Sequence, residues 1–518
     1  MRSVTGVRSG PPAAGRAPPS ADRARVPGRL AVTGIAGSIL IMIAVSVVRD
    51  SWMYPPIVLP AWGPPWDLQA AHLSVPVATG ALWLAIIAGT GGVIAGLVAV
   101  ERGARPSMRA VLIAAAFAVL ALTVLPPAGS TDAFDYAAYG RIMALGHSPY
   151  VTTPSYLRLA HNSYASSVPA VWQHFASVYG PLGSFEQFLA AKLGGVSAAR
   201  IAFWLKLWNS IAFGVVALVA DRLLRSDPAR RLRAHLLWTI NPLLLWDLVA
   251  SGHLDVLAAA AGLLGLVVLG QHSETVRPPL LRVLGAGALI GVAADIKINY
   301  VLFGLGLALV LRRSLAALVT AAAGALVVLV PGYAWFGMPA VRALVSRRNG
   351  ASADSFYSDF LVPSLRPQLA LIAAALVVVV AVLAYRRMPA GMPGRPAIRA
   401  ALVLGVAWSF FWPYQLPWYD AMILCLLVLY PATRLDWLVL ARVAAGTIAN
   451  TPGNPAAPRG PLIGVLHHYS VVVLPPLVLM GAAAALVGLC LTGWWRPRDP
   501  GGPPGPQPET DVLPSVAS

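Results

Sequence analysis

About fourteen apolar stretches recur along this 518-residue chain, and they constrain its fold more than any other feature. Each stretch has about 14 to 24 residues, the length of a helix that crosses the hydrocarbon core of a bilayer. Because 58% of the residues are hydrophobic and 11% are charged, the chain does not have the composition of a soluble domain. The sequence predicts an all-α polytopic membrane protein, a bundle of about 13–14 transmembrane helices with a large exterior loop containing short helices in its first half.

Several of the predicted spans have only about 15 residues, so we expect these to be tilted, broken or shielded by protein around a cavity. Residues 1–29 are rich in Arg and Pro and residues 496–518 in Pro and Gly, which predicts two disordered tails and a membrane domain over 30–495. The spans are 30–48, 77–99, 109–127, 199–223, 232–249, 254–270, 280–297, 298–311, 316–336, 368–385, 398–412, 419–433, 435–449 and 471–493.

The net charge of +18 does not indicate a nucleic-acid partner, because the Lys and Arg residues fall in short loops between apolar stretches. Basic loops face the cytoplasm in membrane proteins. Placing both termini in the cytoplasm of a multi-pass protein of the plasma membrane puts most of these arginines inside. The same orientation leaves three long loops outside, at about 49–76, 128–198 and 337–367.

The largest exterior loop opens on the acidic and aromatic segment 130–141, in a chain with only 20 acidic residues. Carboxylates are costly at a membrane boundary, so they are candidates for chemistry there. We expect a helix that begins at Asp132 and that Gly140 and Gly146 end. In the alternative interpretation, Asp132 caps this helix and Asp135 lies in its first turn. Spacing places four side chains on one helical face: Asp132, Asp135, Tyr136 and Tyr139.

Polar residues recur at two other exterior helix junctions. His253 and Asp255 lie where the fifth predicted span turns into the sixth, and a substrate-binding role and a turn-capping role both fit them. Lys297 follows Asp295 at a helix break. It could hold an anionic phosphate, or it could form an intramembrane ion pair with Asp295.

Two later segments add candidates for binding a lipid-linked substrate. Arg347 and Arg348 in the third exterior loop suit a phosphate, and contact with membrane lipid headgroups is the alternative. The aromatic segment 410–420 interrupts two short spans and contains two prolines, which break the helix where a cavity can open. Its candidate substrate-binding residues are Gln415, Trp418 and Tyr419, and the two aromatic side chains suit stacking on sugars and contact with polyprenyl chains.

Familiar motifs of other chemistries do not occur. The chain has no Walker A sequence, no Gly-rich dinucleotide turn after a strand, no His-Glu-x-x-His and no Gly-x-Ser-x-Gly. No polar segment is long enough for a soluble nucleotide-binding domain. A sugar donor would therefore come from the membrane, as a lipid-phosphate sugar.

The order of these motifs resembles the GT-C mannosyltransferases of actinobacteria over about residues 30–495. More narrowly, the chain looks like the polyprenol-phosphate-mannose-dependent α-1,6-mannopyranosyltransferases. The resemblance rests on the acidic segment from Thr131 to Gly140, Gly146 to Tyr150, the Tyr179-Gly180-Pro181-Leu182 stretch, Asn241-Pro242 followed by Gly252-His253-x-Asp255, Lys297, and Gln415 to Tyr419.

The resemblance implies a GT-C-like bundle that moves mannose from a polyprenyl-phosphate donor to a mannan or lipoglycan acceptor on the exterior face, with inversion. Asp132 matches the family's first-loop acid and would be the general base. Lys297, Arg347, Arg348 or a divalent metal would meet the phosphate charge, and no cofactor is certain. The other implied substrate-binding residues are Asp135, Tyr136, Tyr139, Tyr150, His253, Asp255, Gln415, Trp418 and Tyr419.

Two alternatives remain open at this point. The same fold could carry another lipid-phosphate sugar or use a protein acceptor. A non-enzymatic flippase or transporter of lipid-linked sugars would also place acids in the membrane, but it would favour inverted repeats and acids at span centres, and we detect no internal repeat.

Overall fold

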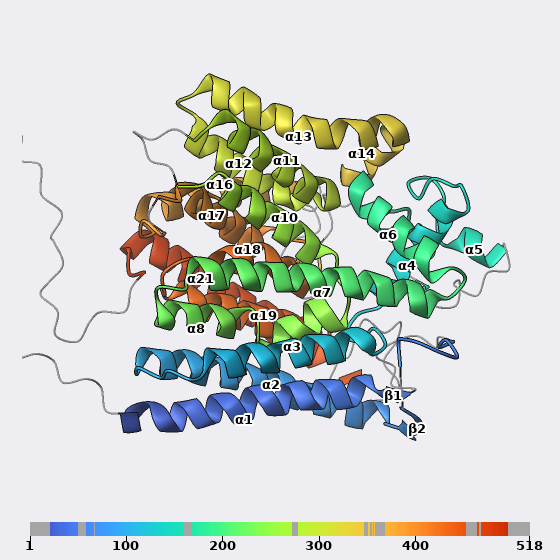
Figure 1. The fold of residues 1–518 in the computed structure, drawn as a ribbon, viewed down its shortest axis with the longest axis horizontal. Helices are drawn as coiled ribbons and strands as arrows, with labels where there is room; N and C mark the ends of the chain where they lie inside the picture. The colour runs from blue at the N-terminus through green and yellow to red at the C-terminus, as the bar shows by residue number, and fades with distance from the viewer. Residues whose placement is uncertain are drawn as a thin grey trace, which may run out of the picture.

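Long helices that lie side by side build the body of the molecule (Figure 1). The computed structural model describes residues 21–49, 58–66, 68–159, 168–170, 172–271, 278–345, 351–352, 355, 357, 368–392, 394–451, 464–465 and 468–495. Six of its helices are long and apolar enough to cross a membrane, or seven if a bent pair of helices counts as one span. The protein is therefore a multi-pass membrane protein.

The first half of the chain forms long helices joined by a segment of shorter ones. Two short strands pair in parallel, and apart from them this half is helical. Its elements are α1 (Ala21–Ser46), β1 (Val48–Arg49), β2 (Leu68–His72), α2 (Val75–Glu101), α3 (Met108–Val124), α4 (Asp132–Ala144), α5 (Ser155–Leu159), α6 (Pro181–Gly194), α7 (Ala198–Leu223), α8 (Pro228–Leu237), α9 (Pro242–Leu244) and the π-helix η2 (Leu245–Ala250).

The regular elements of the second half are all helices among its described residues. Its elements are α10 (Asp255–Val268), α11 (Leu280–Ile296), η3 (Ile298–Tyr300), α12 (Val301–Leu311), α13 (Leu315–Phe336), α14 (Met338–Val345), α16 (Leu369–Arg387), α17 (Pro396–Phe411), η5 (Pro417–Asp420), α18 (Ala421–Leu427), α19 (Leu435–Ala449), η6 (His468–Val473) and α21 (Leu474–Thr492). The prediction of an all-α membrane fold is confirmed, because each predicted span falls on one or more of these helices.

Short polar caps begin several of the helices. The Ser107, Ser197 and Ser314 hydroxyls accept hydrogen bonds from backbone amides in the first turns of α3, α7 and α13. The Asp227 carboxylate does the same for α8. Such caps accept hydrogen bonds from first-turn amides that have no partner within the helix. Each cap residue therefore fixes the position at which its helix begins.

The short spans are broken, as their lengths predict. The helical segments Pro242–Ala250 and Asp255–Val268 meet at 108°, and η3 interrupts the passage from α11 to α12. Both breaks lie on the side of the molecule where α4, α5 and α6 gather, at the right-hand end in Figure 1. Backbone that leaves helical geometry at membrane depth must be buried in protein or must line a cavity.

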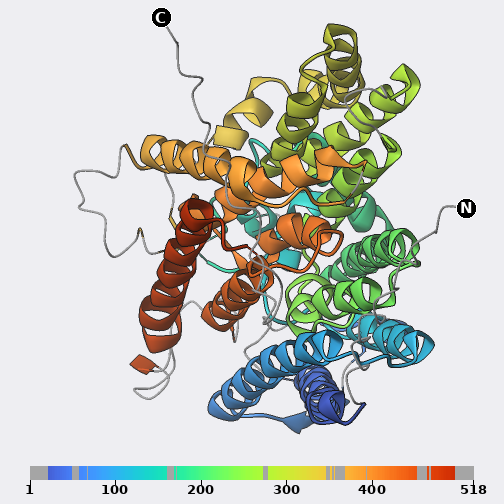
Figure 2. The same cartoon turned by 90° about the vertical axis from the view of Figure 1, so that its left-hand side faces the viewer.

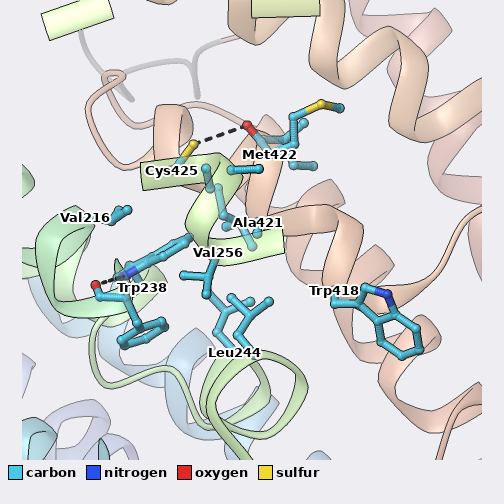
Figure 3. Close-up of a cluster of buried hydrophobic side chains, with 14 of the residues drawn as sticks. Val216, Trp238, Leu244, Val256, Trp418, Ala421, Met422 and Cys425 are labelled. Atoms are coloured by element: carbon cyan, nitrogen blue, oxygen red, sulfur yellow. Dashed lines mark hydrogen bonds between the residues drawn. The ribbon is translucent and has the colours of Figure 1, made fainter. Parts of the chain in front are cut away.

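The bundle packs around buried large side chains. α1 packs on α2, α11 lies between α10 and α13, and α17 contacts α12, α16 and α18. Viewed along the helices, the orange helices α16–α18 lie between the yellow-green helices of the middle of the chain and the blue helices of its beginning (Figure 2). In the cluster of Figure 3, Trp238 donates a hydrogen bond from Nε1 to the carbonyl of Phe213 in α7, over 3.0 Å.

Two sequence-based boundaries differ from the structure. α1 begins at Ala21, inside the segment 1–29 that the composition assigns to a tail. Gly140 does not end α4, which continues to Ala144 and is followed by Gly146. A Cβ atom on Gly140 would lie 2.0 Å from the carbonyl oxygen of Gln187 in α6. Gly140 therefore lets α4 pack closely against α6.

Gly140→Ala should lower the free energy of unfolding by about 1–3 kcal/mol, because the added methyl group pushes α6 away from α4. Thermal or denaturant unfolding in detergent micelles measures this change. Gly214→Ala in α7 is the matched control, because a Cβ atom there meets nothing within 4 Å. Equal stability of the two variants would contradict the close packing of α4 on α6.

Candidate active site

A cavity of about 390 Å³ lies at the end of the bundle that carries α4 and α6. Three segments meet around it: the start of α4, the break between α11 and α12, and the aromatic segment after α17. Its lining includes Ser130, Asp132, Asp135, Tyr139, Trp172, Phe175, Tyr179, Lys297, Asn299, Trp408, Trp412, Tyr414, Trp418, Tyr419 and Asn450. The cavity therefore combines carboxylates, one ammonium group and aromatic rings.

Asp132 occupies the first position of α4 and does not cap it. Its own backbone amide donates a hydrogen bond to the Ser130 hydroxyl over 3.2 Å, and Thr131 is the N-cap residue. The Asp132 carboxylate faces the cavity, with Oδ2 at 3.7 Å from Nδ1 of His253. The interpretation of Asp132 as a helix cap is therefore wrong, and its carboxylate remains available for a ligand.

The two acids of α4 differ in their electrostatic surroundings. Burial raises the pKa of Asp132 to about 6, although the positive charge of Lys297 and nearby hydroxyl groups partly oppose that shift. Burial and the neighbouring Asp132 charge raise the pKa of Asp135 well above its ordinary value. At neutral pH Asp132 is thus mostly ionised, whereas the surroundings of Asp135 favour its protonated form. Asp132 and Asp135 therefore differ in how readily they lose a proton, although they share one helical face.

His253 lies behind the cavity wall, where it contacts Trp418 of the wall and Tyr136, which does not line the cavity. The His253 ring stacks on the Trp418 indole with 3.6 Å between ring centroids, and Nδ1 lies 3.1 Å from the Tyr136 hydroxyl. Tyr136 in turn accepts a hydrogen bond from Tyr179 over 3.4 Å. His253 does not line the cavity itself. It holds the side chains that surround Asp132.

Lys297 lies on the cavity wall and pairs with Asp255. Its ammonium nitrogen is 2.5 Å from Oδ1 of Asp255, which is fully buried at the start of α10, and 3.6 Å from the centroid of the Tyr419 ring. The expected alternative of an ion pair with Asp295 is wrong. Lys297, at the break between α11 and α12, pairs instead with Asp255, which begins α10 after the bend that follows η2. An ammonium group has three N–H donors, so the ion pair with Asp255 leaves donors for a ligand.

A second buried lysine fixes the segment that leads to Asp132. Lys206, in α7, donates hydrogen bonds to the carbonyl oxygens of Leu122, Leu125 and Pro126 over 2.6, 2.7 and 3.3 Å. These carbonyls end α3 and have no partner within that helix. One turn along α7, Asn209 donates a hydrogen bond to the carbonyl of Gly252, next to His253.

Gly252 lies directly against Lys206. It has a φ of +72°, and a Cβ atom there would lie 2.8 Å from Cγ of Lys206. This left-handed conformation and the lack of space both require glycine. One face of α7 therefore anchors the Asp132 segment and the His253 turn together.

Of the remaining predicted site residues, some line the cavity and others do not. Tyr139 lines the cavity and donates a hydrogen bond to the carbonyl of Phe175. Tyr150 donates to the carbonyl of Tyr179, and Gln415 accepts from Arg442, and neither lines the cavity. Arg347 and Arg348 lie outside the described residues.

The structure adds residues that were not among the predicted binding residues. Trp172 and Phe175 come from the segment between α5 and α6, and Trp408 and Trp412 from the last turn and end of α17. Asn299 is buried, with Nδ2 bonded to the Met422 sulfur and with no partner for Oδ1 among the described residues. The four aromatic residues lie in aromatic-rich stretches of the sequence, which could have marked them as candidates. No feature of the sequence around Asn299 marks it as a site residue.

A divalent metal was one candidate for the positive charge of the site. Among the residues that the structure describes, no three His, Cys, Asp or Glu side chains are grouped closely enough to hold a metal ion. The described residues therefore do not fit such an ion, and Lys297 is the cation that they bring to the cavity.

These features define a multi-pass membrane protein with a polar, aromatic-lined cavity at one end of its helical bundle. Residues 31–313, more than half of the chain, match the family described as alpha-(1->6)-mannopyranosyltransferase, N-terminal domain, and the chain belongs to this family. The family membership agrees with the resemblance seen in the motifs.

Individual relatives match over shorter segments. A probable alpha-(1->6)-mannopyranosyltransferase of Mycolicibacterium smegmatis is 30% identical over 29% of this chain and 26% of its own length. Alpha-(1->6)-mannopyranosyltransferase B of Corynebacterium glutamicum is 27% identical over 35% of this chain and 31% of its own. The matches thus span less than a third of these curated relatives.

A solved structure is also similar. ArnT from Cupriavidus metallidurans, bound to undecaprenyl phosphate, superposes with a TM-score of 0.41 and 17% identity, over 74% of this chain and 75% of that one.

Lys297→Met should lower the free energy of unfolding by about 3 kcal/mol or more, because it leaves the Asp255 carboxylate buried without its partner. The double variant Lys297→Met/Asp255→Leu should recover most of this loss, since both charges are then absent. Denaturant unfolding in detergent micelles measures both values. Additive losses in the double variant would show that the two residues do not depend on each other.

Proposed function

We propose that the protein transfers mannose from polyprenyl-phosphate mannose to a mannan or lipoglycan acceptor, forming an α-1,6 linkage on the exterior face of the plasma membrane. The observation that carries this proposal is that the Asp132 carboxylate and the Lys297 ammonium line one cavity. Transfer from a sugar phosphate needs a base for the acceptor and a cation for the leaving phosphate. Membership of the mannopyranosyltransferase family supports mannose as the sugar.

Asp132 is suited to the general base of this reaction. A pKa of about 6 leaves its carboxylate ionised at neutral pH, yet basic enough to take a proton from a hydroxyl group in the transition state. Burial and the Asp132 charge favour the protonated form of Asp135, which can donate a hydrogen bond to the sugar. The base is thus Asp132, and Asp135 is a binding residue.

Lys297 is suited to the donor phosphate. Its pairing with Asp255 fixes the ammonium group at the cavity wall, so little reorganisation is needed when charge develops on the phosphate. The aromatic residues Trp408, Trp412 and Tyr419 lie on the same wall and offer flat apolar faces to the sugar and to the start of the lipid chain.

The transfer is a single displacement. Asp132 takes the proton of the acceptor 6-hydroxyl while the hydroxyl oxygen forms a bond to C1 of the β-linked mannose. The C1–oxygen bond to phosphate breaks, and its electron pair leaves with the polyprenyl phosphate beside Lys297. Attack from the face opposite the leaving group gives the α-linked product.

The orientation of the protein in the membrane is inferred from the distribution of its basic residues relative to the cavity. The helix ends remote from the cavity carry arginines, including Arg102 after α2, Arg312 after α12 and Arg387 at the end of α16. Since basic ends face the cytoplasm, we place the cavity outside and both termini, with their tails, inside.

Asp132→Asn should lower kcat/KM for mannose transfer by about 100-fold or more, because the amide cannot accept the proton. The assay follows radiolabelled mannose from polyprenyl-phosphate mannose to a short α-1,6-mannoside. Asp227→Asn is the matched control, because it makes the same change at a helix cap where asparagine serves equally well. No transfer by the unmodified protein would remove the main support for this function, and full activity of Asp132→Asn would exclude Asp132 as the base.

The kcat/KM of mannose transfer should fall with decreasing pH around about 6. Asp132 must be ionised to act as a base, so activity is retained above its pKa and lost as the carboxylate is protonated below it. A pH profile in buffers of constant ionic strength measures this limb. A limb at about pH 4, the ordinary range for aspartate, would contradict the raised pKa.

A further inference from the structure

A groove at the other end of the bundle carries one acid and one base. It has a volume of about 480 Å³ and lies between α2, α19 and α21, lined by Glu101, Arg434, Trp437, Leu438, Ala485 and Leu489. α19 runs from this groove to the cavity, because Arg434 precedes it and Asn450 follows it on the cavity wall. A helix of 15 residues spans about 22 Å, so the groove is a separate site.

The groove lies where two membrane-crossing helices leave the apolar layer. The span Pro76–Glu101 ends at the groove, and the span His468–Thr492 contributes Ala485 and Leu489 from its last two turns. Trp437 is half-buried on the same wall, as tryptophan often is at the level of the lipid headgroups. The groove therefore connects the headgroup layer with the hydrocarbon layer.

Within the described part of the chain, neither Glu101 nor Arg434 forms an ion pair, although the neighbouring Arg102 lies close enough for its charge to act on Glu101. The Arg434 guanidinium lies 5.8 Å from the centroid of the Trp494 ring and makes no ion pair with Glu101 across the groove. A separate carboxylate and guanidinium complement a ligand that carries an ammonium group and a phosphate.

The outer face of α21 offers space beside these charges. Ala485 is exposed between Gly481 and Gly488, and a Cβ atom on either glycine would meet nothing within 4 Å. This shallow track continues from the groove toward the middle of the span. An acyl chain that lies along it buries apolar surface without displacing a side chain.

We propose that the groove binds a phospholipid with a phosphoethanolamine headgroup. Arg434 binds the phosphate, Glu101 accepts a hydrogen bond from the primary ammonium group, and one acyl chain lies along α21. A choline headgroup has no N–H to donate to Glu101, and a glycerol headgroup has no positive charge. The arrangement therefore selects phosphatidylethanolamine over both of these lipids.

Native mass spectrometry of the purified full-length protein tests this selection. The protein is equilibrated with equimolar phosphatidylethanolamine, phosphatidylcholine and phosphatidylglycerol of matched acyl chains, and retained lipid is counted. The unmodified protein should retain phosphatidylethanolamine about tenfold more than either other lipid, the value of one charged hydrogen bond. Glu101→Gln should remove this preference, and Arg434→Gln should lower retention of all three lipids.

Three further variants separate a specific site from general lipid contact. Ala485→Trp keeps both charges and fills the track, so it should lower retention of phosphatidylethanolamine about tenfold. Asp227→Asn and Arg312→Gln change one charge at the same end of the bundle, outside the groove, and should leave retention unchanged.

Equal retention of the three lipids by the unmodified protein would overturn the proposal. So would an undiminished preference in Glu101→Gln or undiminished retention of phosphatidylethanolamine in Ala485→Trp. The measurement needs no sugar transfer, so its outcome is independent of the proposed mannosyltransferase activity.

Discussion

The hydrogen bonds of the buried Lys206 ammonium are the interaction on which the cavity depends. Three carbonyls at the end of α3 would otherwise face apolar surroundings, and each would carry the cost of a buried unsatisfied group. By binding them, α7 fixes the start of the linker to Asp132. Asn209, on the same face of α7, donates a hydrogen bond to the carbonyl of Gly252, next to His253. The positions of Asp132 and His253 are therefore both fixed by α7.

This anchoring gives the two carboxyl groups of α4 different surroundings although they share one helical face. The cavity brings Asp132 close to His253 and within the field of Lys297, whereas Asp135 has burial and a neighbouring negative charge. The Lys297 charge from the α11–α12 break opposes the rise that burial causes in the pKa of Asp132. Two broken spans and one short helix thus give Asp132 surroundings that Asp135 lacks.

The sequence predicted the membrane class and helices at the positions of the spans, because hydropathy is a local signal. Scarce charges pointed to Asp132, His253 and Lys297 as site residues; Asp132 and Lys297 line the cavity, and His253 lies behind its wall. The sequence did not predict the partner of Lys297: it pointed to the neighbouring Asp295, whereas the structure pairs Lys297 with Asp255, which follows the 108° bend. Lys206 carried a signal that we did not use, a lone lysine within an apolar span. Asn299 and the close packing at Gly140 depend on tertiary contacts that no local pattern encodes.

The central claim is a single displacement at the anomeric carbon within this cavity. The most direct measurement is the anomeric configuration of the product, determined by NMR after the purified protein has reacted with β-mannosyl-phosphoryl polyprenol and a short α-1,6-mannoside. The mechanism predicts a new α-linked mannose and release of polyprenyl phosphate. A β-linked product, or donor that is consumed without a new glycosidic bond, would contradict it.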